Sequence, residues 1–280
     1  MNVGVARRFN AAGAVITLLT VVCAILWAFP IYWGIVSSLK PEDEVVRSTI
    51  ELWPDTLTFE HYVFALTQTQ IGRWYINSIA TALGVTVLTV STSMFAGYAI
   101  SQLRFPLRQP LYWLILASFM VPTQVLIINH FVLMADMRLL NTWAGIILPQ
   151  LIHPVVIIVY KQFFDQVPKD FREAAKMDNA SEFAILFKVY MPMNWGVTTA
   201  LSIVTFIWAW NAFLWPFLAV TKTEMMTITV GITQVNDSFG VYYASQLSAA
   251  VLAGLPVALA YLLFQRRVTQ AITLSAGIKG

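Results

Sequence analysis

Six long apolar stretches run along the chain, at about 11–37, 76–100, 111–133, 143–161, 196–219 and 246–265. None of them contains Asp, Glu, Lys or Arg, except for Lys161 at the edge of the fourth. A helix needs roughly 20 apolar residues to cross about 30 Å of hydrocarbon, and lipid admits only helices and closed barrels. Because the stretches are continuous and do not alternate with polar residues, the pattern predicts an all-α membrane protein with six transmembrane helices.

The first stretch differs from a cleavable secretion signal, although Arg7 and Arg8 precede it. The apolar region of a signal peptide has about 7–15 residues and ends at a small-x-small cleavage site. The run 11–36 is longer, and no clear site of that kind ends it. We therefore expect it to remain as the first transmembrane helix.

The distribution of lysine and arginine predicts the orientation, because cytoplasmic loops carry an excess of both. If the N-terminus is cytoplasmic, 12 of the 17 Lys and Arg residues lie inside and 5 outside. Both termini are then cytoplasmic. The chain divides into an N-terminus with the first helix (1–37), an outside loop (38–75), a transmembrane core (76–265) with a large inside loop (162–195), and a C-terminal tail (266–280). We expect short helices in the outside loop.

Composition agrees with a lipid environment and excludes several functions. Hydrophobic residues make up 58% of the chain and charged residues 11%, against about 25% charged in soluble domains. The net charge is +3 and the basic residues form no stripe, so nucleic acid is not an expected partner. The single cysteine, Cys23, excludes an internal disulfide and zinc-type cysteine spacing. Neither a catalytic constellation nor a metal site is expected.

The inside loop 162–195 predicts two short amphipathic helices joined by a sharp turn. Pro168 suits the start of the first helix, and Asn179 suits a left-handed end. Ser181 can cap the second helix, whose apolar stripe contains Phe183, Leu186, Phe187 and Tyr190, and Pro192 is expected to end it. The pair would fit the headgroup surface of a membrane or a cleft in a partner protein about equally well. The small residues Ala174 and Ala175 favour a partner slightly.

The same loop resembles the EAA loop of binding-protein-dependent ABC permeases. Glu173-Ala174-Ala175 is followed by Asp178-Asn179-Ala180-Ser181 and by Met191-Pro192. Asn179 replaces the usual glycine and Met191 the usual leucine. Asparagine tolerates positive φ best after glycine, so we expect the turn to survive. Further stretches are similar to the MalG-like members of the carbohydrate-uptake type: 37–41 (SSLKP), 77–78 (NS), 210–211 (WN) and 277–280 (GIKG).

The resemblance implies a type I ABC importer permease (MetI-like) fold in a bacterial inner membrane. It implies a second, MalF-like permease subunit, two cytoplasmic ATPases and an extracytoplasmic solute-binding protein as partners. The ATPase contacts implied for the loop are Glu173, Ala174, Ala175, Asp178, Asn179, Ala180, Ser181 and Pro192, and those implied for the tail are Gly277, Lys279 and Gly280. The chain has no G-x-x-x-x-G-K-[ST] loop, so ATP and Mg²⁺ would be bound by the partner ATPase and no cofactor by this chain.

Polar and aromatic residues inside the apolar stretches are candidates for a solute path, although packing and interfacial roles are common for them. Aromatic rings can stack on sugar faces and amides can pair with hydroxyls. The candidates are Gln124, Asn129, Trp208, Trp210, Asn211 and Trp215. His130 is expected to have a structural or interfacial role, and His153 is expected to be hydrogen-bonded to a carbonyl freed by a kink at Pro154.

Three other functions compete with a sugar importer. An ion-coupled secondary transporter usually keeps a carboxylate within the membrane, yet all 14 Asp and Glu residues lie in predicted loops or tails. An ABC permease for another solute class would share the EAA loop. A membrane scaffold without transport activity would leave solute uptake intact when its gene is deleted.

Overall fold

The computed structural model describes residues 11–47, 51–235 and 242–275, and these residues form helices and turns without any strand. This confirms the all-α prediction. The chain forms two compact units, which are treated separately below. The first unit comprises residues 1–69 and 235–252, and the second comprises residues 70–234 and 253–280. The predicted tail contacts Gly277, Lys279 and Gly280 lie outside the described residues.

Three helices are long and apolar enough to cross a membrane without a break. They are Gly13–Ser37 within α1 (Ala11–Ser37), α4 (Ile71–Gln102), and Tyr243–Gln265 within α15 (Tyr243–Ser275). They coincide with the first, second and sixth predicted spans. The stretches between them contain prolines, and their helices are interrupted.

The third and fourth predicted spans are bent pairs of helices. In the third, α5 (Arg108–Phe119) meets η1 (Thr123–Leu126) and α6 (Ile127–Asp136) at 94°. In the fourth, α7 (Trp143–Ile147) and η2 (Leu148–Gln150) meet α8 (Pro154–Asp165) at 53°. Proline cannot donate a backbone hydrogen bond, and Pro122 and Pro154 lie at the two breaks. The kink expected at Pro154 is therefore present.

The fifth predicted span, 196–219, is wrong as a single helix. α12 (Trp195–Asn211) ends at Ala212, whose backbone is extended, and α13 (Leu214–Ala219) follows. Pro216 explains the break, since its ring would clash with the carbonyl of Ala212 in a continuous helix. Counting each bent pair as one span gives up to five candidate spans in the described residues. Six spans remain a prediction.

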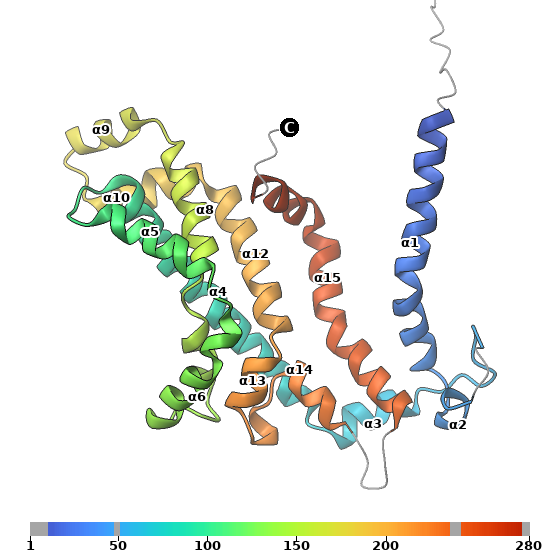
Figure 1. The fold of residues 1–280 in the computed structure, drawn as a ribbon. Coiled ribbons are helices and arrows are strands. Elements are labelled where there is room, and N and C mark those ends of the chain that lie inside the picture. Colours follow the sequence, from blue (N-terminus) through green and yellow to red (C-terminus); the bar gives the residue numbers. More distant parts are fainter. Residues whose placement is uncertain (1–10, 48–50, 236–241, 276–280) are drawn as a thin grey trace, which may run out of the picture. The chain divides into compact units, whose positions relative to one another are not determined.

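The core of the second unit forms where α4 packs against α8 and α12 (Figure 1). Gly97 permits the contact between α4 and α8. A Cβ atom at position 97 would lie 2.7 Å from the Cβ atom of Tyr160 and 3.1 Å from the backbone nitrogen of Lys161. Such distances leave no room for a side chain, so the two helix backbones approach closely here.

Gly97→Ala should therefore destabilise the protein by about 1–3 kcal/mol, the usual cost of overpacking a close-packed core. Thermal unfolding of the detergent-solubilised protein measures this as a lower midpoint. Gly72→Ala is the matched control, because it lies in the same helix with open space around it. Its midpoint should stay the same or rise, since alanine favours a helix more than glycine does. Equal midpoints for both variants would contradict this view of the α4–α8 contact.

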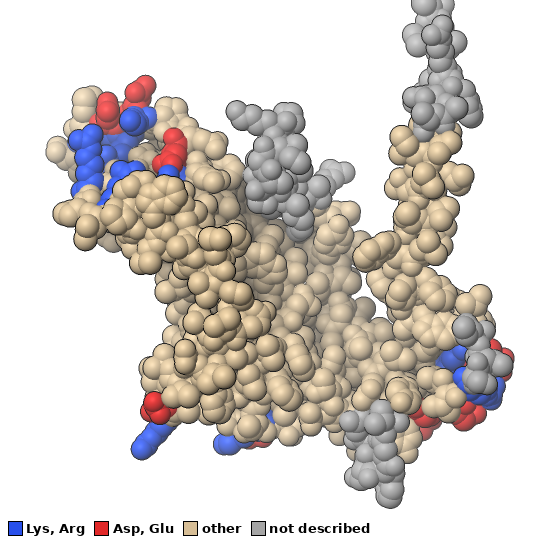
Figure 2. Space-filling view, viewed as in Figure 1, with Lys and Arg blue, Asp and Glu red and all other residues tan. Residues whose placement is uncertain are grey.

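On the face seen in Figure 2, the charged side chains of the second unit gather at its two ends and leave an uncharged band between them. One end carries α9 (Lys169–Met177) and α10 (Glu182–Ile185), and α6, α13 and α14 (Ile228–Gly231) lie at the other (Figure 1). At that second end, the buried Asn77 side chain donates to the carbonyls of Glu224 and Met226, both at 2.9 Å. The uncharged band agrees with burial in lipid.

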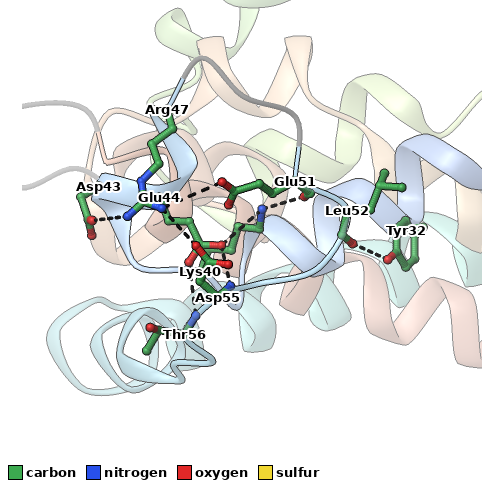
Figure 3. Close-up of polar contacts among 9 residues, drawn as sticks. All are labelled: Tyr32, Lys40, Asp43, Glu44, Arg47, Glu51, Leu52, Asp55 and Thr56. Atoms are coloured by element: carbon green, nitrogen blue, oxygen red, sulfur yellow. Dashed lines mark hydrogen bonds and ion pairs between the residues drawn. The ribbon is translucent and has the colours of Figure 1, made fainter.

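The first unit contains two short helices in the predicted outside loop, α2 (Glu42–Val45) and α3 (Glu60–Gln68). The buried Glu44 carboxylate accepts from the backbone nitrogen of Asp55 at 2.9 Å and lies 3.5 Å from the Lys40 ammonium (Figure 3). Arg47 pairs with Asp43 and Asp55. These contacts hold the described part of the loop in place, and the two short helices agree with the helices expected there.

Candidate coupling surface and transport cavity

The inside loop folds into the two predicted helices, α9 and α10. The Ser181 hydroxyl accepts from the backbone nitrogen of Ala184 at 3.2 Å, which caps α10. Asn179 has φ 55°, in the left-handed region. Both features were expected from local sequence, and the asparagine in place of glycine keeps the turn.

Pro192 does not end the second helix, so that prediction is wrong. Helical structure continues from α10 through η3 (Leu186–Tyr190), which is a π-helical turn, into α11 (Met191–Met193). A π-helical turn changes the hydrogen-bonding interval from four residues to five. This wider turn directly before Pro192 accommodates a residue that has no backbone N–H.

One carboxylate joins the loop to α4. Glu182 accepts a hydrogen bond from the Tyr98 hydroxyl at 2.7 Å and another from the Arg172 guanidinium at 2.7 Å. Its carboxylate also lies 3.2 Å from the Lys176 ammonium. Because Tyr98 belongs to α4 and the two cations belong to α9, Glu182 connects three helices at one point.

Electrostatics favour the ionised form of Glu182. Burial opposes its ionisation, but the contacts from Tyr98, Lys176 and Arg172 together outweigh that effect. They hold the pKa of Glu182 below its ordinary value. The carboxylate is therefore charged at neutral pH and can hold both cations of α9.

An aromatic cluster at the base of the loop packs next to Glu182 and supports its contacts with α4 and α9. Tyr98 packs edge-on against Tyr190, with ring centroids 5.2 Å apart, and against Phe164 at 6.1 Å. The Tyr190 hydroxyl donates to the Gln102 side chain at 2.8 Å. Tyr190 and Phe164 are fully buried. The base of the loop is thus part of the core that contains α4 and α8.

The predicted ATPase contacts differ in exposure. Glu173, Ala174, Asp178, Asn179, Ser181 and Pro192 are exposed, whereas Ala175 and Ala180 are partly buried against the chain's own core. The predicted apolar stripe is also divided. Leu186 and Tyr190 are buried, but Phe183 is 68% exposed and Phe187 43%. In the described residues Glu173 forms no ion pair with this chain. The surface available to a partner therefore centres on α9 and the turn after it.

Asn179→Gly should change loop stability by less than about 1 kcal/mol, because asparagine already adopts the left-handed conformation here. Asn179→Val should cost at least about 1–2 kcal/mol, since a β-branched residue is strained at positive φ. Hydrogen exchange of the α9 and α10 amides compares the two variants with the parent chain. A large gain in protection for the glycine variant would mean that asparagine strains this turn.

A cavity of about 360 Å³ lies in the second unit, where the three helix breaks meet. Thr123 and Gln124 line it from the first break, Gln150 and His153 from the second, and Ala212 and Phe213 from the third. Non-helical backbone at membrane depth is tolerated only where it is buried in protein or lines a cavity. The coincidence of three breaks around one cavity follows this rule and makes the cavity a candidate for the solute path.

Three of the six predicted path residues line this cavity, namely Gln124, Trp208 and Trp215. The other three do not. Trp210 is buried and donates to the carbonyl of Ala253 at 3.4 Å. The amide of Asn211 donates to the carbonyl of Ile207 within its own helix, at 2.8 Å. Asn129 lies on α6 outside the cavity lining.

Two histidines that were not among the predicted path residues also line the cavity. His153 stacks on Trp208, with ring centroids 4.8 Å apart and 28° between the planes. His130 contacts Trp215 edge-on at 5.9 Å. The expected bond from His153 to a freed carbonyl is absent, since its Nδ1 atom has no hydrogen-bond partner in the described residues. Pro154 was the signal that placed His153 at a helix break, whereas no comparable signal stands next to His130, which lies within α6.

Comparison with known proteins identifies relatives over nearly the whole chain. Residues 89–273 match the family model of the binding-protein-dependent transport system inner membrane component. The arabinooligosaccharides transport system permease protein AraQ of Bacillus subtilis (strain 168) is 30% identical over 276 residues, which cover 98% of each chain. The lactose transport system permease protein LacG of Rhizobium radiobacter is 29% identical, over 89% of this chain and 90% of its own.

A third relative and a solved structure extend this comparison. The sn-glycerol-3-phosphate transport system permease protein UgpE of Brucella abortus (strain 2308) is 29% identical, over 92% of this chain and 93% of its own. A crystal structure of a bacterial ABC transporter involved in the import of the acidic polysaccharide alginate has a chain of similar fold. The TM-score is 0.82 at 22% identity, covering 95% of this chain and 99% of that chain.

Proposed function

This chain belongs to the family of inner-membrane components of binding-protein-dependent transport systems, and on that premise we propose that it forms half of the pore of an ATP-driven sugar importer. Sugars or sugar derivatives are the solutes because the named relatives transport arabinooligosaccharides, lactose and sn-glycerol 3-phosphate. The chain itself is a permease without catalytic activity. It lies in the bacterial inner membrane with six spans and both termini in the cytoplasm.

The observation that carries this proposal is the exposed face of α9. Glu173 and Ala174 are exposed there, on a helix held to α4 through Glu182. A small alanine allows a partner to approach closely, and the Glu173 carboxylate can pair with a partner's arginine or lysine. Movement of that partner would reach the pore helices directly, because the base of the loop is packed into their core.

The partners follow from this arrangement and from the family. Two cytoplasmic ATPases bind ATP and Mg²⁺ and contact Glu173, Ala174, Asp178, Asn179, Ser181 and Pro192 of this chain. Ala175 and Ala180 contribute mainly by setting the position of α9, and Gly277, Lys279 and Gly280 contact the ATPases from the tail. A second permease subunit completes the pore, and an extracytoplasmic binding protein delivers the solute.

Reconstitution tests the proposal. The chain is co-expressed with a second permease and an ATPase encoded in the same genome, purified as a complex and placed in proteoliposomes with the cognate binding protein. Uptake of radiolabelled arabinotriose or lactose should require internal ATP and the binding protein. Uptake driven by a proton or sodium gradient without ATP would support a secondary transporter instead. A complex that hydrolyses ATP without any uptake would contradict the permease function.

A further inference from the structure

Three phenylalanines form an exposed patch where the segment 182–190, which comprises α10 and η3, lies beside α4. Phe95 of α4 meets Phe183 and Phe187 edge-on, with ring centroids 6.1 and 6.0 Å apart. All three side chains are exposed in this chain, and we call them the phenylalanine patch. Large apolar rings that stay exposed together are typical of a surface that a partner or lipid covers.

The length of α4 places this patch at the border of the membrane. α4 has 32 residues and is about 48 Å long, whereas the hydrocarbon layer is about 30 Å thick. If the excess length is shared between the two ends of the helix, about 9 Å lies outside the hydrocarbon at each end. Phe95 lies about 11 Å before the end of α4 at Gln102. The patch is therefore level with the boundary between acyl chains and headgroups.

The exposed face of α4 points away from the cavity. Val85 and Thr89 line the cavity, and a second permease that shares the pore would lie on that side. Two residues along a helix turn by about 200°, so Leu83 and Val87 point in the opposite direction. Both are exposed and apolar, and Phe95 follows Val87 after a little over two turns. The side of α4 that leads to the phenylalanine patch is thus the side that faces lipid.

A lysine next to the patch supplies the matching charge for a lipid headgroup. Lys188 directly follows Phe187, is exposed, and forms no ion pair with the described residues of this chain. Glu182 is the one acidic residue of the segment 182–190, and it already binds Tyr98 and Arg172. A lysine stem can lie along apolar surface while its ammonium reaches the headgroups, and anionic lipids of the cytoplasmic leaflet attract such cations.

We propose that the phenylalanine patch lies among the acyl chains of the cytoplasmic leaflet, with the Lys188 ammonium at the headgroup of an anionic phospholipid. The inference rests on the proposed inner-membrane position of the chain. The two interpretations of the inside loop then apply to different helices, because α9 faces the ATPase and the segment 182–190 faces lipid. Since Glu182 joins this segment to α9 and α4, the lipid contact fixes the height of α9 above the membrane.

Photocrosslinking identifies what covers the patch. Benzoylphenylalanine replaces Phe183, whose phenyl ring it retains, in the assembled complex of this chain, the second permease and the ATPase. The complex is placed in vesicles of equal parts phosphatidylethanolamine and phosphatidylglycerol, and mass spectrometry identifies the adducts after illumination. Lipid adducts should dominate, and phosphatidylglycerol should exceed phosphatidylethanolamine by about 2- to 5-fold, the effect of one lysine near an anionic surface. Lys188→Gln should bring the two lipids close to parity.

Lys169→Gln is the matched control, because it makes the same change at an exposed position of α9 and should leave the lipid ratio unchanged. Adducts mainly with the ATPase or the second permease would overturn the proposal, and so would equal labelling of the two lipids when Lys188 is present. Sugar uptake by the same vesicles tests the proposed function separately. Uptake without lipid adducts refutes the lipid contact alone, whereas lipid adducts without uptake support the contact and contradict the permease function.

Discussion

Glu173→Lys should reduce ATP-driven uptake by at least about 30-fold in the reconstituted complex. The side chain is exposed on α9 and forms no ion pair within the described part of the chain, so its proposed partner belongs to the ATPase. Removing one member of a charged interface pair typically costs about 2–5 kcal/mol, and a lysine adds repulsion against the partner cation. Uptake rate and ATP hydrolysis should be measured together, because a failure of docking lowers both.

Two controls separate docking from a general effect of charge. Glu173→Gln keeps the shape and loses only the charge, so its uptake should lie between those of the parent and the lysine variant. Asp136→Lys makes the same charge change at an exposed position at the other end of the second unit. Its uptake should be close to that of the parent. If all three variants transport at the parental rate, Glu173 has no part in coupling.

Glu182→Ala should uncouple transport from ATP hydrolysis through a different mechanism. The substitution removes the acceptor of the hydrogen bonds from Tyr98 and Arg172 and so loosens α9 from α4. Hydrogen bonds to charged groups contribute about 1.5–3 kcal/mol each, and partial exposure of Glu182 reduces this. We expect the attachment of α9 to α4 to lose about 1–2 kcal/mol of free energy. The ratio of molecules with α9 attached to molecules with α9 detached would then fall by a factor of about 5–30. Uptake per ATP should fall accordingly, with hydrolysis less affected.

The pH dependence of the same junction provides an independent check. The pKa of Glu182 is lowered in the folded protein, so its stabilising contribution is complete above the unfolded-state pKa of about 4.5. That contribution is lost as the pH falls from there through the lower folded-state pKa. Protection of the α9 amides against hydrogen exchange should therefore weaken in this acid range. Glu182→Gln should remove this dependence, and a parental pH profile in that variant would exclude Glu182 as the titrating group.

Local features of the coupling loop were predictable from sequence, and the contacts that hold it were not. The cap from Ser181 and the left-handed Asn179 depend on neighbouring residues, so residue type was enough to predict them. The bond between Tyr98 and Glu182 joins positions 84 residues apart. Nothing in the spacing of either residue indicates that partner, because the two meet only when the loop packs against the core that α4 shares with α8.

The cavity, too, was only partly predictable from the sequence. Pro122, Pro154 and Pro216 indicate that helices are interrupted, and the breaks occur near them. A sequence does not show that three such breaks face one another. Residue type alone therefore left His153 and Thr205 out of the predicted path although both line the cavity, whereas Trp210 and Asn211 were selected and turned out to bond within the protein.

Photocrosslinking from α9 tests most directly whether the loop meets an ATPase or the lipid surface. Met177 lies on α9 and is 82% exposed, so benzoylphenylalanine can replace it with little disturbance. Met137, 52% exposed at the other end of the second unit, is the matched control position. In native membranes, illumination should join the probe at position 177 to the ATPase and should give no such product from position 137. Adducts with lipid alone from position 177, or equal labelling of the ATPase from both positions, would contradict the account.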